Sequence, residues 1–400
     1  MIVEATSTYW IGLDDTDERE YGCTTHDFNH LLNHLIDCEY DIVDPRLVRL
    51  WPFAPRRTRG NAALSAGVVT TNRSKVEVHL DQWFSTRFSN VTPLDTNHSA
   101  QPVLLLCEDK LPESMYWETV QTHINLEDRV KQLREYQHRL WSTASGQSGL
   151  IGASAAIAWR GDHDYTWECT AWRATSGPRN VPPHLVSDMT IRFPSTILNR
   201  DPNAHRSLIA PRTPCPVLYG IRGETRQGVL DAHSYLQEHG AELSIGHRAH
   251  RTNQATDDHL HSSASGIVTE IQIMQGGHVQ IDAGPQLISF SKGGDVNTLA
   301  QSLVVGDMIE WNGLADHEGI IHLERLRLIQ GNRDKSRPNC NCGTRYKSQG
   351  NQQPLRCPSC GSEHDNVWLS QTISSDWKEP APSNRRHLSK PLSRKGKSQG

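Results

Sequence analysis

The sequence predicts a multidomain protein of the α+β class. Its 400 residues exceed what one ordinary hydrophobic core requires. Helix-like and strand-like patterns alternate through the first two thirds of the chain, several short strands follow, and four clustered cysteines come after them. These changes of pattern predict domains at 1–140, 141–262, 263–330 and 331–379, followed by a basic tail at 380–400.

The N-terminal region opens with an apolar run, Tyr9–Leu13, that predicts a buried strand. We expect a helix from about Thr25. Its apolar residues recur at the helical spacing i, i+3, i+4 and i+7: Phe28, Leu31, Leu32 and Leu35. Thr24 and Asp27, three positions apart, form an approximate capping box where this helix begins.

The hydrophobic pattern is less informative after this predicted helix. Leu47–Trp51 predicts a second strand, whereas residues 72–140 are polar and aperiodic and predict no element. Gly149–Ile157 is rich in small residues, which indicates a helix packed closely on a sheet. Strands are expected at Thr166–Trp172 and Val217–Ile221, so this region also mixes helix and strand.

Residues 263–330 predict a small β-domain. Short strand candidates are separated by Gly and Asp turns, at 265–273, 278–281, 302–311 and 320–328. Several short strands without a long helix favour an OB-fold barrel, and a β-sandwich is the alternative.

Charge is distributed unevenly. Residues 331–400 carry 13 Lys and Arg against 5 Asp and Glu, while the preceding 330 residues carry 28 against 40. A basic segment on an acidic body is typical of an enzyme that grips a polyanion, but a disordered, solubilising tail has the same composition. No apolar run is long enough to span a membrane, no secretory signal is visible, and five cysteines are dispersed as reduced thiols. We therefore expect a cytoplasmic protein.

The first candidate site is the acidic run Asp14, Asp15 and Asp17. Carboxylates this close repel one another unless a cation neutralises them, and magnesium prefers such hard oxygen ligands. Gly22–Thr25 leads into the predicted helix, whose positive end favours phosphate. Together they predict a magnesium–nucleotide site, with an exposed acidic turn and an ordinary helix cap as the alternative.

The second candidate is Arg56–Asn61, where three arginines beside a glycine are suited to holding phosphates. A solvated loop is equally compatible with it. The third is the cysteine cluster, in which Cys340 and Cys342 precede Cys357 and Cys360. This spacing predicts a zinc ribbon, with disulfides as the competing interpretation.

Taken in order, several segments resemble the archaeal tRNA 2-agmatinylcytidine synthetases. The segments that carry the resemblance are Ile11–Asp17 with Cys23–Thr25, Arg46–Leu50 with Thr58–Ala62, Gly149–Ala156, Asp164–Glu168, Cys215–Gly223, Thr252–His259, the cysteines, and Arg386–Leu392. The resemblance implies a kinase-like α/β N-terminal domain, a ferredoxin-like α+β domain, an OB-fold and a C-terminal zinc ribbon.

The resemblance also implies an activity. Members of this family are ATP-dependent ligases that join agmatine to the 2-carbon of the wobble cytidine in the CAU anticodon of isoleucine tRNA. The reaction passes through a phosphorylated cytidine, splits ATP to AMP, and lets the tRNA read AUA. The expected cofactors are ATP, magnesium and zinc. The expected partners are this tRNA and agmatine, without DNA or membrane, for a monomeric protein.

Residue roles follow from the same resemblance. Asp14, Asp15 and Asp17 would hold magnesium and the triphosphate, and Thr24 matches the threonine that becomes phosphorylated. The other nucleotide-site residues would be Gly12, Thr16, Gly22, Thr25, Arg57, Arg59 and Asn61. Those expected on the agmatine side are Asp164, Tyr165 and Glu168.

Three positions depart from the family pattern. Arg57 replaces a lysine, Gly22 falls one position late, and only one residue separates Cys340 from Cys342. Two other interpretations stay open: a non-catalytic RNA-binding factor, and a kinase-like enzyme that acts on a small metabolite.

Overall fold

The computed structural model describes residues 6–18, 22–57, 60–89, 100–366 and 369–397. The chain forms two compact units. The first combines Met1–Leu260 with Ala381–Gly400, and the second is His261–Pro380. The end of the chain therefore returns to the unit in which the chain begins.

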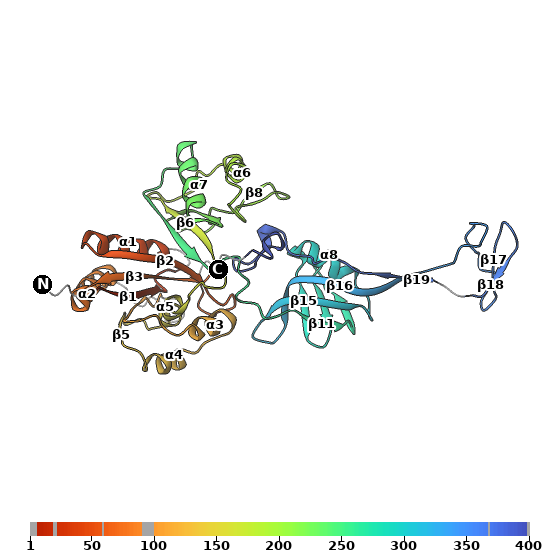
Figure 1. The fold of residues 1–400 in the computed structure, drawn as a ribbon, viewed down its shortest axis with the longest axis horizontal. Helices are drawn as coiled ribbons and strands as arrows, with labels where there is room; N and C mark the ends of the chain where they lie inside the picture. Colours follow the sequence, from red (N-terminus) through yellow and green to blue (C-terminus); the bar gives the residue numbers. More distant parts are fainter. Residues whose placement is uncertain (1–5, 19–21, 58–59, 90–99, 367–368, 398–400) are drawn as a thin grey trace. The chain divides into compact units, whose positions relative to one another are not determined.

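The first unit is organised around one eight-stranded sheet (Figure 1). Its strands, from edge to edge, are β5 (His138–Ser142), β4 (Val103–Cys107), β1 (Ser7–Asp14), β3 (Ala62–Thr70), β2 (Asp41–Arg49), β10 (Gly246–Thr252), β6 (Thr166–Trp172) and β9 (Val217–Gly223). Neighbours are antiparallel except β2 and β10, which run parallel with Leu47 opposite Thr252. This junction makes the first 260 residues share one sheet.

Helices cover both faces of the N-terminal half of this sheet. On one face lie α1 (Thr24–Asp37) and α2 (Arg73–Phe88); on the other lie α3 (Ser114–Gln121), α4 (Leu126–Leu133) and α5 (Gly149–Ala158). Side chains of β1 alternate accordingly: Ile11 and Leu13 pack towards α1 and α2, whereas Trp10 packs towards α5. The strand predicted at Tyr9–Leu13 is confirmed.

The predicted helical stripe of α1 is also confirmed. Phe28, Leu31, Leu32 and Leu35 are all 0 % exposed. Burial of each such side chain stabilises the fold by about 1.5–3 kcal/mol. Helix α5 is confirmed as well, and its small residues do what the pattern predicts: a Cβ on Gly12 would meet the Ala153 carbonyl oxygen at 2.4 Å. Only glycine permits β1 and α5 to approach this closely.

The other half of the sheet is covered by α7 (Arg226–Glu238), which packs on β6, β9 and β10, and α6 (Pro183–Arg192) packs against α7. The strands predicted at Thr166–Trp172 and Val217–Ile221 are confirmed as β6 and β9. A two-stranded hairpin, β7 (Arg200–Asp201) and β8 (Arg206–Ser207), lies between α6 and β9 in the sequence.

Residues 72–140, for which the sequence pattern predicts no element, form α2, β4, α3, α4 and β5. One local expectation is wrong. The capping box is absent: Cys23 is the N-cap without a side-chain cap bond, and the Thr24 hydroxyl donates to Asp17 instead. Asp27 accepts from Thr16 Oγ1 at 2.6 Å, so both expected capping side chains hold the preceding loop.

The second unit contains a sheet that curves into an OB-like half-barrel. Its path is β11 (Ala264–Ile267), β15 (Met308–Ala315), β16 (Ile321–Ser336), β14 (Gln286–Ser289), β13 (Val279–Asp282) and β12 (Glu270–Ile273). In addition β19 (Leu369–Ile373) pairs with β16. The strand expected at 265–273 is two strands, and the one expected at 302–311 begins only at Met308, after helix α8 (Asp295–Ser302). A short hairpin, β17 (Leu355–Arg356) and β18 (Glu363–His364), carries part of the cysteine cluster.

The basic tail is ordered against the first unit, which disfavours the alternative of a disordered, solubilising tail. The amides of Ala255 and Asp257 donate to the carbonyls of His387 and Leu388, each at 2.9 Å. Two short 3-10 turns, Pro382–Asn384 and Leu392–Arg394, shape the segment. None of the helices in the described part of the chain is long and apolar enough to cross a membrane.

Candidate active site

The acidic run lies where β1 meets the start of α5. β1 ends at Asp14, and the chain then turns at Asp15, whose φ of 57° lies in the left-handed region. A Cβ on Gly152 would lie 1.8 Å from Asp14 Oδ2, and one on Gly149 would lie 2.7 Å from the Asp14 carbonyl oxygen. The two glycines thus let the first turn of α5 pack directly against the Asp14 carboxylate.

The carboxylates of Asp14 and Asp15 are electrostatically strained. Burial, reinforced by Asp15, raises the pKa of Asp14 well above its usual value. Burial also raises the pKa of Asp15 to about 7; Asp17 adds to this rise and Arg56 opposes it. Asp15 Oδ2 is buried without a hydrogen-bond partner among the residues that the structure describes. Clustered oxygens with one unsatisfied atom fit a hard divalent cation such as Mg²⁺.

A cavity of about 240 Å³ opens beside these carboxylates. Arg56 and Asn61 line it from one loop, and Ser148 lines it from the start of α5. The rings of Trp51 and His123, both in its wall, lie 6.0 Å apart. The cavity therefore offers carboxylates, a guanidinium, a helix N-terminus and aromatic rings. These groups suit a magnesium–nucleotide complex.

Thr24, the first residue of α1, is held beside Asp17. Its Oγ1 donates to Asp17 Oδ1 at 3.1 Å and accepts from the Thr16 amide at 3.4 Å. Gly22 makes this approach possible: its φ is 76°, and a Cβ there would lie 2.9 Å from the Thr16 carbonyl oxygen. The glycine that falls one position late in the sequence therefore shapes the loop over Asp17.

A second cavity, of about 400 Å³, adjoins the first. Thr24, Thr25, Arg49 and Glu168 line it, while Asp17 and Ala62 line both cavities. Asp17 therefore lies at the boundary between a space suited to a nucleotide and a larger one. That position is where a group transferred from a nucleotide would meet its acceptor.

Glu168 is the buried acid of the larger cavity. It accepts hydrogen bonds from Gln254 Nε2 and Thr170 Oγ1, and its Oε2 lies 3.6 Å from Arg49 NH2. Burial favours a raised pKa, but Arg49 and Gln254 outweigh it and lower the pKa of Glu168. The side chain is therefore an anion facing the cavity.

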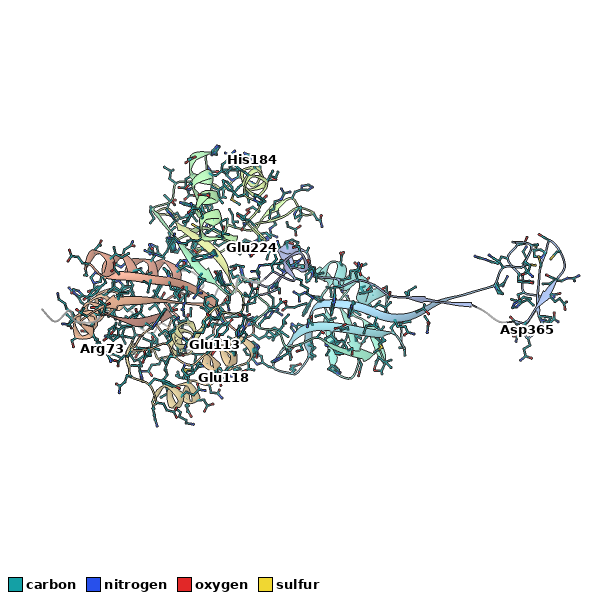
Figure 2. The ribbon with its side chains drawn as sticks, viewed as in Figure 1. Arg73, Glu113, Glu118, His184, Glu224 and Asp365 are labelled. Atoms are coloured by element: carbon teal, nitrogen blue, oxygen red, sulfur yellow. The ribbon has the colours of Figure 1, made fainter. Side chains whose placement is uncertain are left out.

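Asp164 does not face either cavity. Arg394 NH1 and NH2 lie 2.5 and 2.7 Å from its two oxygens, and Lys390 Nζ lies 2.9 Å away. Arg394 also donates to Glu224 from Nε at 3.0 Å (Glu224 is labelled in Figure 2). The carboxylate expected to bind a ligand guanidinium is occupied by the chain's own guanidinium, which argues against that role.

Five more predicted residues lie away from the two cavities or outside the described part. Gly12 is buried against α5. The Thr16 hydroxyl donates to Asp27 and so holds the loop between β1 and α1. Tyr165 packs beside the core, and the guanidinium carbon of Arg251 lies 5.2 Å from the centroid of its ring. Arg59 falls outside the described residues. Arg57 is exposed, donates to the Ala54 carbonyl at 2.9 Å, and borders a smaller pocket of about 180 Å³.

Three residues of the larger cavity were not singled out as site residues in the sequence: Arg49, Arg222 and His387. Arg49 and Arg222 lie at or near strand ends, and His387 comes from the docked tail. A buried arginine inside an apolar strand such as Leu47–Leu50 is a usable signal, because an unpaired guanidinium is costly to bury. His387 has no local signal, since only the return of the tail brings it to the site.

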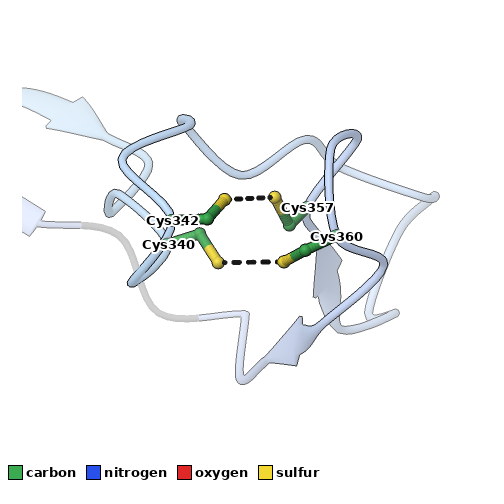
Figure 3. A group of neighbouring side chains, drawn as sticks. All are labelled: Cys340, Cys342, Cys357 and Cys360. Carbon is green, nitrogen blue, oxygen red and sulfur yellow. Dashed lines mark hydrogen bonds between the residues drawn. The ribbon is translucent and has the colours of Figure 1, made fainter.

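The cysteine cluster is compact (Figure 3). The sulfur atoms of Cys340, Cys342, Cys357 and Cys360 all lie within 4.8 Å of one another, and two pairs are 3.4 Å apart. Four thiolates around zinc at about 2.3 Å would be about 3.8 Å apart. All four cysteines are free, which disfavours the disulfide interpretation. The cluster fits zinc despite the short Cys340–Cys342 spacing.

These observations define a multidomain α+β protein with a carboxylate-rich site that suits a nucleotide and a four-cysteine cluster that fits a metal ion. Residues 10–144 match the TiaS TCKD domain and residues 147–259 match the TiaS FLD domain. The chain belongs to the TiaS family, the tRNA(Ile2) 2-agmatinylcytidine synthetases.

Relatives match along almost their whole length. The tRNA(Ile2) 2-agmatinylcytidine synthetase TiaS of Methanocorpusculum labreanum is 30% identical, over 96% of each chain. That of Methanosarcina acetivorans is also 30% identical, over 96% of this chain and 97% of its own. Among solved structures, apo TiaS has a TM-score of 0.80 at 26% identity. A TiaS–tRNA(Ile2)–AMPCPP–agmatine complex has a TM-score of 0.78 at 25% identity; in both structures 98% of each chain is covered.

Proposed function

We propose that this chain is an ATP-dependent ligase that conjugates agmatine to the 2-carbon of the wobble cytidine in the CAU anticodon of tRNA(Ile2). Two relatives, each 30% identical over 96% of this chain, carry the name of this activity. A similar solved structure holds tRNA(Ile2), an ATP analogue and agmatine together. The observation in this chain that carries the proposal is the pair Asp17–Thr24, located where a nucleotide-type cavity meets a larger one.

The chemistry requires a poor leaving group to become a good one. The 2-carbonyl oxygen of cytidine accepts the γ-phosphoryl group, the agmatine amine attacks the 2-carbon, and phosphate leaves with the former carbonyl oxygen. The bond between the α- and β-phosphates of ATP is hydrolysed as well, so the overall products are AMP, the phosphate from the γ position and the phosphate from the β position. Magnesium held by Asp14, Asp15 and Asp17 would neutralise the triphosphate. Arg56 and the start of α5 would orient its phosphates from the wall of the smaller cavity.

Thr24 is placed to exchange a phosphoryl group. Its hydroxyl already donates to the Asp17 carboxylate, which can accept the proton when the oxygen attacks phosphorus. It lines the larger cavity, where the cytidine would enter. We therefore infer that Thr24 is phosphorylated by ATP during the catalytic cycle.

The agmatine guanidinium would face Glu168. This carboxylate is an anion in the larger cavity, and its 3.6 Å separation from Arg49 NH2 is longer than a direct hydrogen bond. A planar cation reaching the cavity can therefore still find acceptor capacity there. Asp164 and Tyr165 drop out of this subsite, because their surroundings are filled by Arg394 and Arg251.

The second unit would hold the tRNA. We infer an OB-fold at 263–330 and a zinc ribbon at 331–379, after kinase-like and ferredoxin-like domains at 1–140 and 141–262. The basic residues around the cysteine cluster (Arg345, Lys347 and Arg356) supply phosphate contacts. The chain would act on this tRNA as a monomer in the cytoplasm.

Mass spectrometry of tRNA(Ile2) after incubation with the protein, ATP, Mg²⁺ and agmatine tests this function. We expect an ATP-dependent gain of the agmatine mass, less water, at the wobble cytidine. An elongator methionine tRNA with the same anticodon is the control and should stay unmodified. A zinc-loaded protein that binds tRNA(Ile2) and produces no gain would instead be a non-catalytic RNA-binding factor.

A further inference from the structure

Three metal-ligating side chains meet outside the sites described above. The ligand atoms of His34, Cys38 and His79 all lie within 4.8 Å of one another. Cys38 Sγ and His79 Nδ1 are 3.4 Å apart. The cluster lies where α1 ends, on the face that α2 covers, and none of its members lines either cavity.

The fold fixes all three positions. His34 and Cys38 are four residues apart, so they project from the same side of α1. His79 projects from α2, whose neighbouring Val76 and Leu80 are 0 % exposed in the core shared with α1. The rings of His34 and His79 lie 6.0 Å apart at 64°. Core packing therefore brings the three ligands together before any ion binds.

One atom in the cluster lacks a partner. His34 Nε2 is buried and makes no hydrogen bond with any residue in the part of the chain that the structure describes. Buried ring nitrogens are normally satisfied, and a metal ion can satisfy the nitrogen of an imidazole that lies beside a thiol and a second imidazole. In a tetrahedral zinc site, nitrogen at about 2.0 Å and sulfur at about 2.3 Å lie about 3.5 Å apart. The Cys38–His79 separation has this length.

We propose that His34, Cys38 and His79 bind a second zinc ion, separate from the four-cysteine cluster, with water as the fourth ligand. Two imidazoles and one thiolate are a donor set that zinc accepts, and the thiol proton is released on binding. The 14 residues of α1 put the site about 20 Å from Thr24, at a rise of about 1.5 Å per residue. The ion therefore clamps α1 to α2 and takes no part in the reaction.

Metal analysis of the full chain tests the proposal. The protein is stripped with a chelator under reducing conditions, dialysed against Zn²⁺ and measured by mass spectrometry of the metal. Wild type should hold two zinc ions per chain, and the double variant Cys38→Ser/His79→Ala should hold one. His184→Ala, on α6 in Figure 2 and exposed, is the matched control and should keep two. One zinc per chain in wild type, or two in the double variant, overturns the proposal.

Cobalt gives a second readout that does not depend on a double substitution. With Co²⁺ in both sites, five thiolates contribute to the sulfur-to-metal charge-transfer band, four from the cluster in Figure 3 and one from Cys38. Cys38→Ser should lower the intensity of this band by about one fifth, because intensity scales with the number of bound thiolates. An unchanged band in a folded Cys38→Ser protein excludes Cys38 as a ligand. Circular dichroism of the same samples establishes that they are folded.

Discussion

Thr24 Oγ1 donates a hydrogen bond to Asp17 Oδ1 at 3.1 Å, joining the first residue of α1 to the acidic run that follows β1. Both residues are nearly buried, with exposures of 5% and 8%. Asp17 borders both cavities, whereas Thr24 borders the larger one. A hydroxyl with an acceptor already aligned, at the meeting point of two cavities, is the arrangement that a phosphoryl relay requires.

Thr24→Val tests this relay. The substitution keeps the shape of the side chain and removes the hydroxyl, so we expect the single-turnover rate of tRNA modification to fall by about 10²-fold or more, with tRNA affinity unchanged. Thr190→Val on α6 is the matched control, since among the described residues its hydroxyl bonds only the Ser187 carbonyl. A Thr24→Val protein that works at the wild-type rate would exclude a phosphothreonine.

Asp15 makes stability depend on pH. Its pKa is about 7 in the folded protein against 3.8 ordinarily, so the folded state keeps a proton that the unfolded chain has released. The free energy of unfolding of the metal-free protein should therefore fall as pH rises from about 4 to 7, by at most about 4 kcal/mol. Urea unfolding at intervals of pH measures this slope.

Asp15→Asn should reduce that slope, to which the raised pKa of Asp14 also contributes, and it should abolish turnover and spare tRNA binding. Mg²⁺ should stabilise the wild type more at pH 8 than at pH 5, because the ion binds the charged carboxylates. The Asp15→Asn variant should gain less stability from Mg²⁺ than the wild type does. If the free energy of unfolding changes equally with pH in wild type and variant, Asp15 does not cause that change.

Substitutions of Glu168 and Asp164 should affect different quantities: agmatine binding for Glu168 and stability for Asp164. Glu168→Gln should raise the KM for agmatine by about tenfold or more, since a charge-assisted bond contributes about 1.5–3 kcal/mol. Asp164→Asn should leave this KM unchanged and lower the free energy of unfolding by about 3 kcal/mol, because it breaks a buried pair with Arg394. Steady-state kinetics and urea unfolding of both variants distinguish the two roles. A KM effect confined to Asp164→Asn would reverse our assignment.

Cys357→Ser should release the zinc of the cysteine cluster. The sulfur of Cys357 is buried between its neighbours, so loss of one thiolate opens the ligand set. We expect one zinc fewer per chain by metal analysis and weaker tRNA binding in a filter assay. Ser359→Ala, two residues away, should change neither quantity. Retention of the full zinc content in Cys357→Ser would contradict the four-cysteine set.

The predictable elements were those with a strong local pattern. Each of three elements could be predicted from about ten residues of sequence: α1 from its apolar stripe, β1 from its apolar run and α5 from its small residues. β4 is a run of five apolar residues buried on both faces, and such a short run has no periodicity that would distinguish a strand from a buried helix. α2 mixes its buried positions with charged ones, so it shows no clear apolar stripe. The parallel pairing of β2 with β10 joins residues about 200 positions apart and has no local signal.

The site residues that could be predicted were likewise those that lie close together in the sequence. Asp14, Asp15, Asp17 and Thr24 could be predicted together because they lie within a few residues of one strand end. Asp164 has the chemistry of a cation ligand, but the cation it binds, Arg394, lies 230 residues further along the chain. Glu168 has equivalent chemistry and faces a cavity. Only the fold distinguishes these two carboxylates.

The return of Ala381–Gly400 to the first unit makes His261–Pro380 an insertion rather than an appendage. An insertion is tethered at both of its ends, so a single proteolytic cut within it would not release a fragment from the native protein. Arg394, Lys390 and the paired backbone of His387 and Leu388 would keep the C-terminal piece attached. The enzyme would thus survive as a nicked two-chain complex that separates only on denaturation.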